Sequence, residues 1–158
     1  MDKTLFKQIE ALESENYLIS FLSNVTAVLK ENIRYINWVG FYFYNGTELV
    51  LGPFQGLIAC NPIQTNKGVC GASFTSREIL IVPDVHKFEG HIACDSNSKS
   101  EIVLPLIYND ICYGVLDIDS PIENRFTKSD AIILDEIANI ISRKLAWHNF
   151  DLNPKDIK

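Results

Sequence analysis

The pair Asn45-Gly46, which follows an aromatic run, constrains the fold of this chain more than any other short segment. Residues 38–44 (WVGFYFY) are rich in the aromatic and β-branched side chains that favour strands. Asn-Gly supplies the positive φ angles of a tight hairpin turn, and residues 48–54 can return along the first strand. The sequence therefore predicts an antiparallel hairpin over residues 38–54.

The two ends of the chain have the periodicity of amphipathic helices. Near the N-terminus, apolar side chains recur at helical spacing at Leu18, Phe21, Leu22, Val25 and Leu29. A shorter helix around residues 5–12 is expected to pack beside this one or against a second subunit. The closing helix is expected to start at Thr127, with Asp130 three residues on as in a capping box. Its apolar face consists of Ile133, Ile137, Ile140, Ile141 and Leu145.

The middle of the chain is expected to hold a second hairpin and a long irregular segment. The expected elements are strands at 79–82, 101–108 and 112–119, a short helix at 68–76, and loops at 56–66 and 83–100. An irregular stretch of that second length often serves as a lid or binding loop. Helices at both ends with hairpins between them predict an α+β fold. In it, an antiparallel sheet has the N- and C-terminal helices packed on one face and a loop-covered pocket on the other.

Length and composition limit the functional classes. The 158 residues, 47% hydrophobic and 22% charged, suit a single globular domain over 1–158. A net charge of −6 without a basic patch argues against nucleic acid as a partner. The apolar runs are too short to span a membrane, and the N-terminus mixes acidic and basic residues where a signal peptide would be basic and then apolar. We therefore expect a cytoplasmic protein with no membrane contact.

Three cysteines, Cys60, Cys70 and Cys94, lie in segments expected to be loops or a helix start. A single cysteine is most often a small buried hydrophobe, but three in such segments suggest thiol chemistry. A helix N-terminus or convergent backbone N–H groups can stabilise a thiolate, so Cys70 and Cys94 are both candidate nucleophiles. Periodicity does not choose between them. Cys112, in a strand between apolar neighbours, is expected to be inert.

A metal site is the alternative use of these thiols. His86 and His91 lie close to Cys94 in the sequence, with two more cysteines upstream. Structural zinc sites usually bring ligands in close pairs such as C-x-x-C, and this chain has no such pair. We therefore expect no metal and no cofactor, and we expect both histidines to be partly exposed loop residues.

Asp117 and Asp119 form the second group of candidate functional residues. They alternate with Leu116 and Ile118 in one expected strand, so both carboxylates lie on one face of the sheet. On a solvent-facing strand this would be unremarkable. In a pocket, however, acids this close cannot all stay ionised, so at least one pKa rises and a proton donor exists near neutral pH.

Glu101 is the natural third acid, but the register of the second hairpin decides whether it can join them. A two-residue loop that pairs Tyr108 with Ile111 places Glu101 opposite Ile118, on the wrong face. An acidic cluster therefore requires a three- or five-residue connection, or a bulge, near residues 109–111. Pro105 makes such irregular pairing plausible.

The chain resembles the free methionine-(R)-sulfoxide reductases, stand-alone enzymes built on the GAF fold. The resemblance runs over residues 37–121 through NWVGFYF, LGPFQGLIAC, GVCGASF, HIACDSNSKSEIVLPL and GVLDIDSP. The three loop cysteines have the family's spacing, whereas the terminal helices match only as generic GAF helices. The resemblance implies a cytoplasmic enzyme of oxidative-stress defence that reduces free methionine (R)-sulfoxide, with thioredoxin as reductant and a homodimer as its assembly.

The resemblance also implies a role for each thiol. Cys94 corresponds to the cysteine that attacks the sulfoxide sulfur and becomes a sulfenic acid, and Cys60 to the partner that resolves it to a disulfide. Cys70 is similar to the third family cysteine, whose part is less settled and includes auxiliary recycling. The long loop must then let the reductant reach the Cys60 to Cys94 bond, so some mobility is expected in residues 83–100.

The resemblance assigns the substrate contacts as well. Glu101, Asp117 and Asp119 match the acids that hold the substrate and help to protonate its oxygen, and Trp38 matches the aromatic residue beside its methyl group. A sulfoxide sulfur becomes electrophilic as its oxygen gains a proton, so a thiolate and a carboxyl must converge on one S–O group. The acids also raise the thiol pKa, which the substrate ammonium would offset.

The backbone around Ile92 and Ala93, up to Cys94, is expected to receive the substrate carboxylate through its N–H groups. Two rival functions remain at this stage. A ligand-binding GAF sensor would need no thiol chemistry, and such sensors are usually joined to an output domain. A redox-sensing adaptor would have reactive cysteines but no acid-lined pocket.

Overall fold

A computed structural model describes residues 1, 3–92 and 94–152. Within these residues, six strands form one antiparallel sheet in the order β3-β2-β1-β6-β5-β4. The strands are β1 (Trp38–Tyr44), β2 (Glu48–Gln55), β3 (Ile63–Gln64), β4 (Leu80–Val82), β5 (Ser100–Tyr108) and β6 (Ile111–Ser120). Strands β1, β6 and β5 occupy the centre of the sheet, so their side chains reach both faces.

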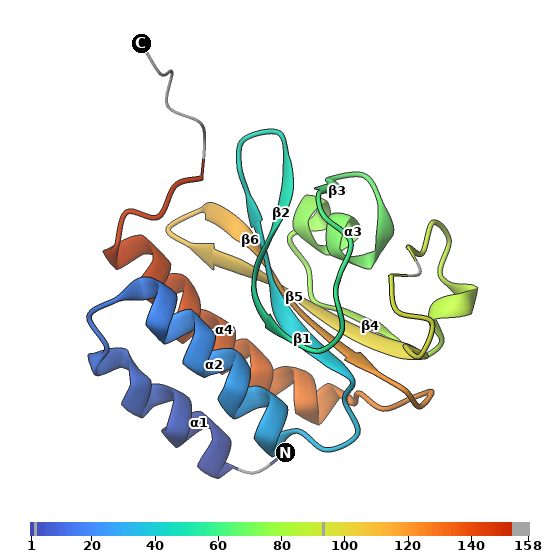
Figure 1. Cartoon of the computed structure of the whole chain (residues 1–158), viewed down its shortest axis with the longest axis horizontal. Coiled ribbons are helices and arrows are strands. Elements are labelled where there is room, and N and C mark those ends of the chain that lie inside the picture. The colour runs from blue at the N-terminus through green and yellow to red at the C-terminus, as the bar shows by residue number, and fades with distance from the viewer. Residues whose placement is uncertain (2, 93, 153–158) are drawn as a thin grey trace.

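The helices divide between the two faces of the sheet, as Figure 1 shows. They are α1 (Lys3–Ala11), α2 (Leu18–Asn32), α3 (Gly68–Ser76) and α4 (Lys128–Trp147), with single 3₁₀ turns at Leu12–Ser14 and Val85–Lys87. Helices α1, α2 and α4 cover one face, and α3 lies on the other with the loops. The predicted α+β architecture is confirmed. None of the described helices is long and apolar enough to cross a membrane.

Alternation along the central strands separates two kinds of interior. In β6, Leu116 and Ile118 join the apolar core beneath α2 and α4. Asp117 and Asp119 lie on the opposite side, as the pattern predicted. Strand β1 alternates in the same way, since Phe41 belongs to the helix-side core. Each central strand therefore contributes to the core on one face and to the pocket on the other.

The terminal helices begin and pack for the predicted reasons. Thr127 Oγ1 accepts from the Asp130 backbone N–H at 3.2 Å, and Asp130 Oδ2 accepts from the Thr127 N–H at 3.0 Å, which completes the capping box of α4. Leu5 and Ile9 of α1 are buried within this chain, where α1 packs on α2 and α4. Helix α3 has the predicted bounds.

The backbone conformation of the first hairpin turn differs from the prediction. Both hairpins form, but at the first turn only Gly46 has positive φ, because Asn45 Oδ1 accepts hydrogen bonds from the Thr47 and Glu48 N–H groups in an Asx turn. The two-residue turn with positive φ at both positions occurs instead at Asn109-Asp110. Strand β3, which lies within the loop expected at 56–66, pairs with β2 at the sheet edge and was not predicted.

Candidate active site

A β-bulge in β6 brings the three acids onto one face. Tyr108 pairs with Ile111, as a two-residue loop requires, but the register then shifts so that Leu106 faces Gly114 and Tyr113 is left over. Gly114 has φ +149°, and a Cβ there would lie 2.0 Å from the Tyr42 carbonyl oxygen. The extra residue reverses the alternation, so Glu101 pairs with Asp119. The irregularity that the acidic cluster required is therefore present.

The acids meet a cysteine at the base of the pocket. Cys70 of α3, Glu101 of β5 and Asp117 of β6 are all buried, and one potential ligand atom from each lies within 4.8 Å of the others. Burial raises the pKa of Asp117 to about 6. Burial, with the charges of Asp117 and Asp119 added, raises the pKa of Glu101 well above its usual value. Burial also raises the pKa of Asp119, with help from the Asp117 charge.

The groups around Asp117 indicate how the cluster shares protons. Asp117 Oδ1 is buried and accepts no hydrogen bond from a backbone N–H or from an amide, hydroxyl or ammonium group of the described residues. The groups within reach of the Asp117 carboxylate are the Cys70 thiol and a protonated Glu101. Burial raises the pKa of Cys70 well above its usual value, and the neighbouring acids add to the shift. We therefore assign Asp117 as the ionised acid, with Glu101 and Cys70 as its proton donors.

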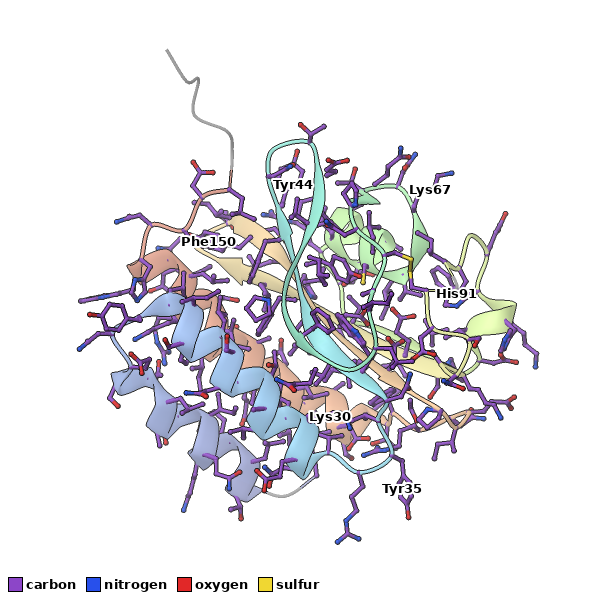
Figure 2. All side chains as sticks on the ribbon, viewed as in Figure 1. Lys30, Tyr35, Tyr44, Lys67, His91 and Phe150 are labelled. Atoms are coloured by element: carbon purple, nitrogen blue, oxygen red, sulfur yellow. A yellow bond between two sulfur atoms is a disulfide. The ribbon has the colours of Figure 1, made fainter. Side chains whose placement is uncertain are left out.

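A disulfide joins Cys60 to Cys94 at the pocket, with their Cα atoms 5.5 Å apart. Figure 2 shows it as a yellow bond near the labelled Lys67 and His91, which line the same pocket. Both cysteines are half-buried, so the bond is partly accessible. This is the pairing that the resemblance implied. It shows that the two thiols can approach closely enough to react.

Polar contacts hold the two loops that carry this disulfide. The Tyr42 hydroxyl donates to the Cys60 carbonyl oxygen at 2.8 Å. On the other loop, Asn37 Nδ2 donates to Asp95 Oδ2 at 2.9 Å and to Ser98 Oγ at 3.0 Å. These bonds tie both loops to the start and middle of β1. The disulfide therefore lies over a pocket with a fixed wall.

That wall is aromatic. Trp38 stacks on Tyr42 and on Phe54, with ring centroids 5.9 Å and 5.3 Å apart. Its indole Nε1 donates to the Leu57 carbonyl oxygen at 3.1 Å. Trp38 is thus buried as a core residue would be, and it also lines the pocket.

The pocket unites most of the predicted residues. The empty space between its walls, open mouth included, is about 540 Å³. The predicted residues along it are Trp38, Cys70, Ile92, Cys94, Glu101, Asp117 and Asp119. Cys60 reaches it through the disulfide. Ala93 lies outside the described residues.

The structure bears on two expectations, one for the backbone N–H groups near Cys94 and one for the two histidines. The Cys94 N–H donates to the Ile92 carbonyl oxygen at 3.0 Å, so it is not free to receive a substrate carboxylate in this structure. His86 is exposed beside Asp84, and His91 is a half-buried loop residue, as expected, which also lines the pocket. Burial lowers the pKa of His91. Cys112, on β6, is a free, half-buried thiol whose pKa burial raises.

Sequence reasoning missed several pocket residues. Tyr42 lies two alternations from Trp38 on the same strand face, and this period-two pattern could have identified it. Lys67, which lines the pocket, carries no such signal. Nor does Asn37, which holds the Cys94 loop through Asp95 and Ser98, both distant in sequence. The potential metal ligands also group differently: among the described residues, only Cys70, Glu101 and Asp117 converge as a possible set of three, without a histidine.

Comparison with known proteins gives one consistent family. The model of the GAF domain matches residues 17–145. A free methionine-R-sulfoxide reductase of Escherichia coli strain K12 is 44% identical over 88% of this chain and 84% of its own length. A free methionine-R-sulfoxide reductase of Neisseria meningitidis, solved in complex with its substrate, superimposes with a TM-score of 0.86 at 41% identity, covering 90% of this chain and 86% of that one. A putative GAF sensor protein of Burkholderia vietnamiensis gives 0.87 at 44% identity, covering 92% of both chains.

Proposed function

The chain belongs to the GAF domain family, and on that premise we propose that it reduces free L-methionine (R)-sulfoxide to L-methionine. A relative and a structural neighbour that are named for this reaction support the proposal. The observation that carries it lies in this chain. A redox-capable cysteine pair closes over a pocket whose base holds three carboxyl groups with raised pKa values.

The chemical step uses both parts of the pocket. The Cys94 thiolate attacks the sulfoxide sulfur while Glu101 or Asp119 protonates the oxygen. The sulfur–oxygen bond breaks as oxygen passes to Cys94, which leaves methionine and a Cys94 sulfenic acid. Burial raises the pKa of Glu101 and of Asp119 well above the usual range of a carboxyl group, which makes each of them a suitable proton donor.

Charge complementarity favours a free amino acid as substrate. The Asp117 carboxylate, with its unpartnered Oδ1, suits the substrate ammonium. The substrate carboxylate can be received at the N-terminus of α3, which lines the pocket without a side-chain cap, with Lys67 beside it. Trp38 offers an apolar surface to the methyl group. A methionine within a polypeptide has neither charge at its α-position.

The second half of the cycle restores the thiols. Cys60 attacks the Cys94 sulfenic acid, water leaves, and the disulfide forms. A dithiol donor, which we propose to be thioredoxin, then reduces the bond. Cys70 is an unsuitable attacking thiol, since it is only 4% exposed and its pKa is raised. We assign it instead to donating a hydrogen bond to the ionised Asp117 carboxylate.

Cellular context is part of the proposal. A disulfide that is repeatedly reduced suits the cytoplasm, where thiol reductants are maintained. We also propose a homodimer. The helix-covered side leaves large apolar residues exposed, including Tyr17 and Ile19 near the start of α2 and Trp147 at the end of α4. Light scattering on the purified protein measures the mass directly.

The proposed activity is tested by supplying separated epimers of free L-methionine sulfoxide with dithiothreitol. We expect turnover of the R epimer, little of the S epimer, and none of an acetylated, amidated R-sulfoxide that lacks both charges. A redox adaptor or a ligand sensor would turn over none of the three. Equal turnover of the blocked and free substrates would refute the assignment of the charge-matched pocket.

A further inference from the structure

The loop that carries Cys60 presents two large apolar side chains to solvent. Leu57 is 61% exposed and Ile58 is 89% exposed. Both lie between the end of β2 and Cys60. The loop is held rather than loose, because Trp38 Nε1 bonds the Leu57 carbonyl oxygen and the Tyr42 hydroxyl bonds the Cys60 carbonyl oxygen. Its exposed side chains are therefore a fixed feature of the surface.

These side chains adjoin the disulfide. Ile58 is two residues from Cys60, and it lines the rim of the same pocket as Cys94 and Lys67. Lys67 is exposed and lies near the disulfide in Figure 2. The surface next to the Cys60–Cys94 bond thus combines a two-residue apolar patch with one cation.

Disulfide exchange constrains what can touch this surface. The attacking sulfur must contact a disulfide sulfur in line with the bond, so a protein reductant must place its own surface against the residues around it. Apolar side chains at that position become buried by a protein reductant but not by a small dithiol. A lysine beside the bond attracts the attacking thiolate.

We propose that Leu57 and Ile58, with Lys67, form the docking surface for a dithiol protein of the thioredoxin class. This inference rests on the proposed function, because it concerns the step that returns the disulfide to two thiols. The partner's thiolate attacks one sulfur of the Cys60–Cys94 bond, forms a mixed disulfide and releases the other cysteine. The partner's second thiol then breaks the mixed disulfide. Two electrons and two protons pass to this chain, and the partner leaves oxidised.

The test uses the isolated half-reaction, without methionine sulfoxide. The oxidised protein is mixed with reduced thioredoxin or with dithiothreitol, and the loss of the disulfide is followed by quenching and mass spectrometry. The test variant is Leu57→Ser/Ile58→Ser. The matched control is Ile132→Ser, which removes a 65% exposed apolar side chain from α4, on the other side of the sheet.

In the double variant, we expect the second-order rate constant with thioredoxin to fall about tenfold, while the constant with dithiothreitol stays within about twofold. The control should leave both constants unchanged. Equal losses with both reductants, or no loss with thioredoxin, would overturn the docking surface. Because the assay contains no sulfoxide, either result is independent of whether the wild-type protein reduces methionine sulfoxide.

Discussion

The two faces of the central sheet use the same strands for opposite purposes. Toward α2 and α4, β5 and β6 contribute fully buried Ile102, Leu116 and Ile118 to an apolar core. Toward α3, the intervening positions place Glu101 and Asp117 in a pocket, 5% and 6% exposed. Burial of apolar groups stabilises the fold, whereas burial of unpaired acids costs free energy. In each of these strands, one step of alternation separates the side chains that stabilise the fold from those that can take part in chemistry.

The largest effect should come from the pocket face, through Cys94→Ser. A hydroxyl in place of the nucleophile is expected to lower single-turnover reduction of free methionine (R)-sulfoxide by roughly a thousandfold or more. Cys60→Ser should keep the first turnover and lose recycling. Rapid-quench measurement of methionine formed per enzyme separates the two effects. Cys112→Ser, at the free thiol outside the pocket, serves as control, and normal turnover in Cys94→Ser would contradict the assignment.

A substitution on the helix-covered face should lower stability and leave the chemical step almost unchanged. Leu116→Ala removes a fully buried side chain from the core and is expected to lower the free energy of unfolding by about 2–5 kcal/mol. Single-turnover rate per folded molecule should change little, because the side chain points away from the pocket. Urea unfolding and rapid quench measure the two quantities. A large loss of chemistry at unchanged stability would show that the faces are not independent.

The pH dependence of stability sharpens the contrast. The pKa of Asp117 rises to about 6 on folding, so between about pH 4 and pH 6 the native state holds a proton that the unfolded state has released. The unfolding free energy attributable to this group therefore falls as pH rises, by about 3 kcal/mol across that window. Urea unfolding of wild type and Asp117→Asn at several pH values isolates the contribution. A slope that Asp117→Asn leaves unaltered would remove Asp117 as its source.

The smallest effect is expected at Cys70, which lies on the pocket side of the sheet next to Asp117. Cys70→Ser keeps a hydrogen-bond donor to Asp117 and should alter turnover by only about threefold. Cys70→Ala removes that donor, so the Asp117 pKa should rise and the pH profile of single turnover should move upward. If Cys70 instead relays electrons, both variants would slow thioredoxin-driven recycling equally and leave the pH profile in place.

The sequence allowed prediction of what short-range chemistry decides. The capping box at Thr127, the bounds of α3 and the alternation around Asp117 each depend on neighbours a few residues away. The position of the bulge at Tyr113 could not be predicted. It depends on the close approach of Tyr42, on another strand, to the neighbouring Gly114. The long-range contacts of Asn37 escaped prediction for the same reason. Two-residue β3 carries too short a pattern to be distinguished from a loop.

The presence of the two hairpin turns was predictable from the sequence, but their conformations were not. Asn45-Gly46 had the stronger signal for a two-residue turn, yet the Asn45 side chain supplies the bonds that the backbone would otherwise make. Asn109-Asp110 forms a two-residue turn, which alone would place Glu101 opposite Ile118. The bulge further along β6 shifts the register so that Glu101 pairs with Asp119. Local sequence therefore predicted that each hairpin turns. The form of the first turn depends on the Asn45 side chain, and the register of the second hairpin depends on the close approach of Tyr42 to Gly114.

The bulge at Tyr113 has a consequence for where the coding sequence can gain or lose codons. Loss of one codon between Gly114 and Asp119 would place Asp119 opposite Ile102 and direct its carboxylate toward the apolar core. Loss of the Tyr113 codon would remove the bulge but leave Glu101 opposite Asp119. Codons can be gained or lost at the Asn109-Asp110 tip without touching that relation, provided that the strands keep their phase. Insertions and deletions that survive selection should therefore collect at the tip or at the bulge, and the span between Gly114 and Asp119 should keep its length.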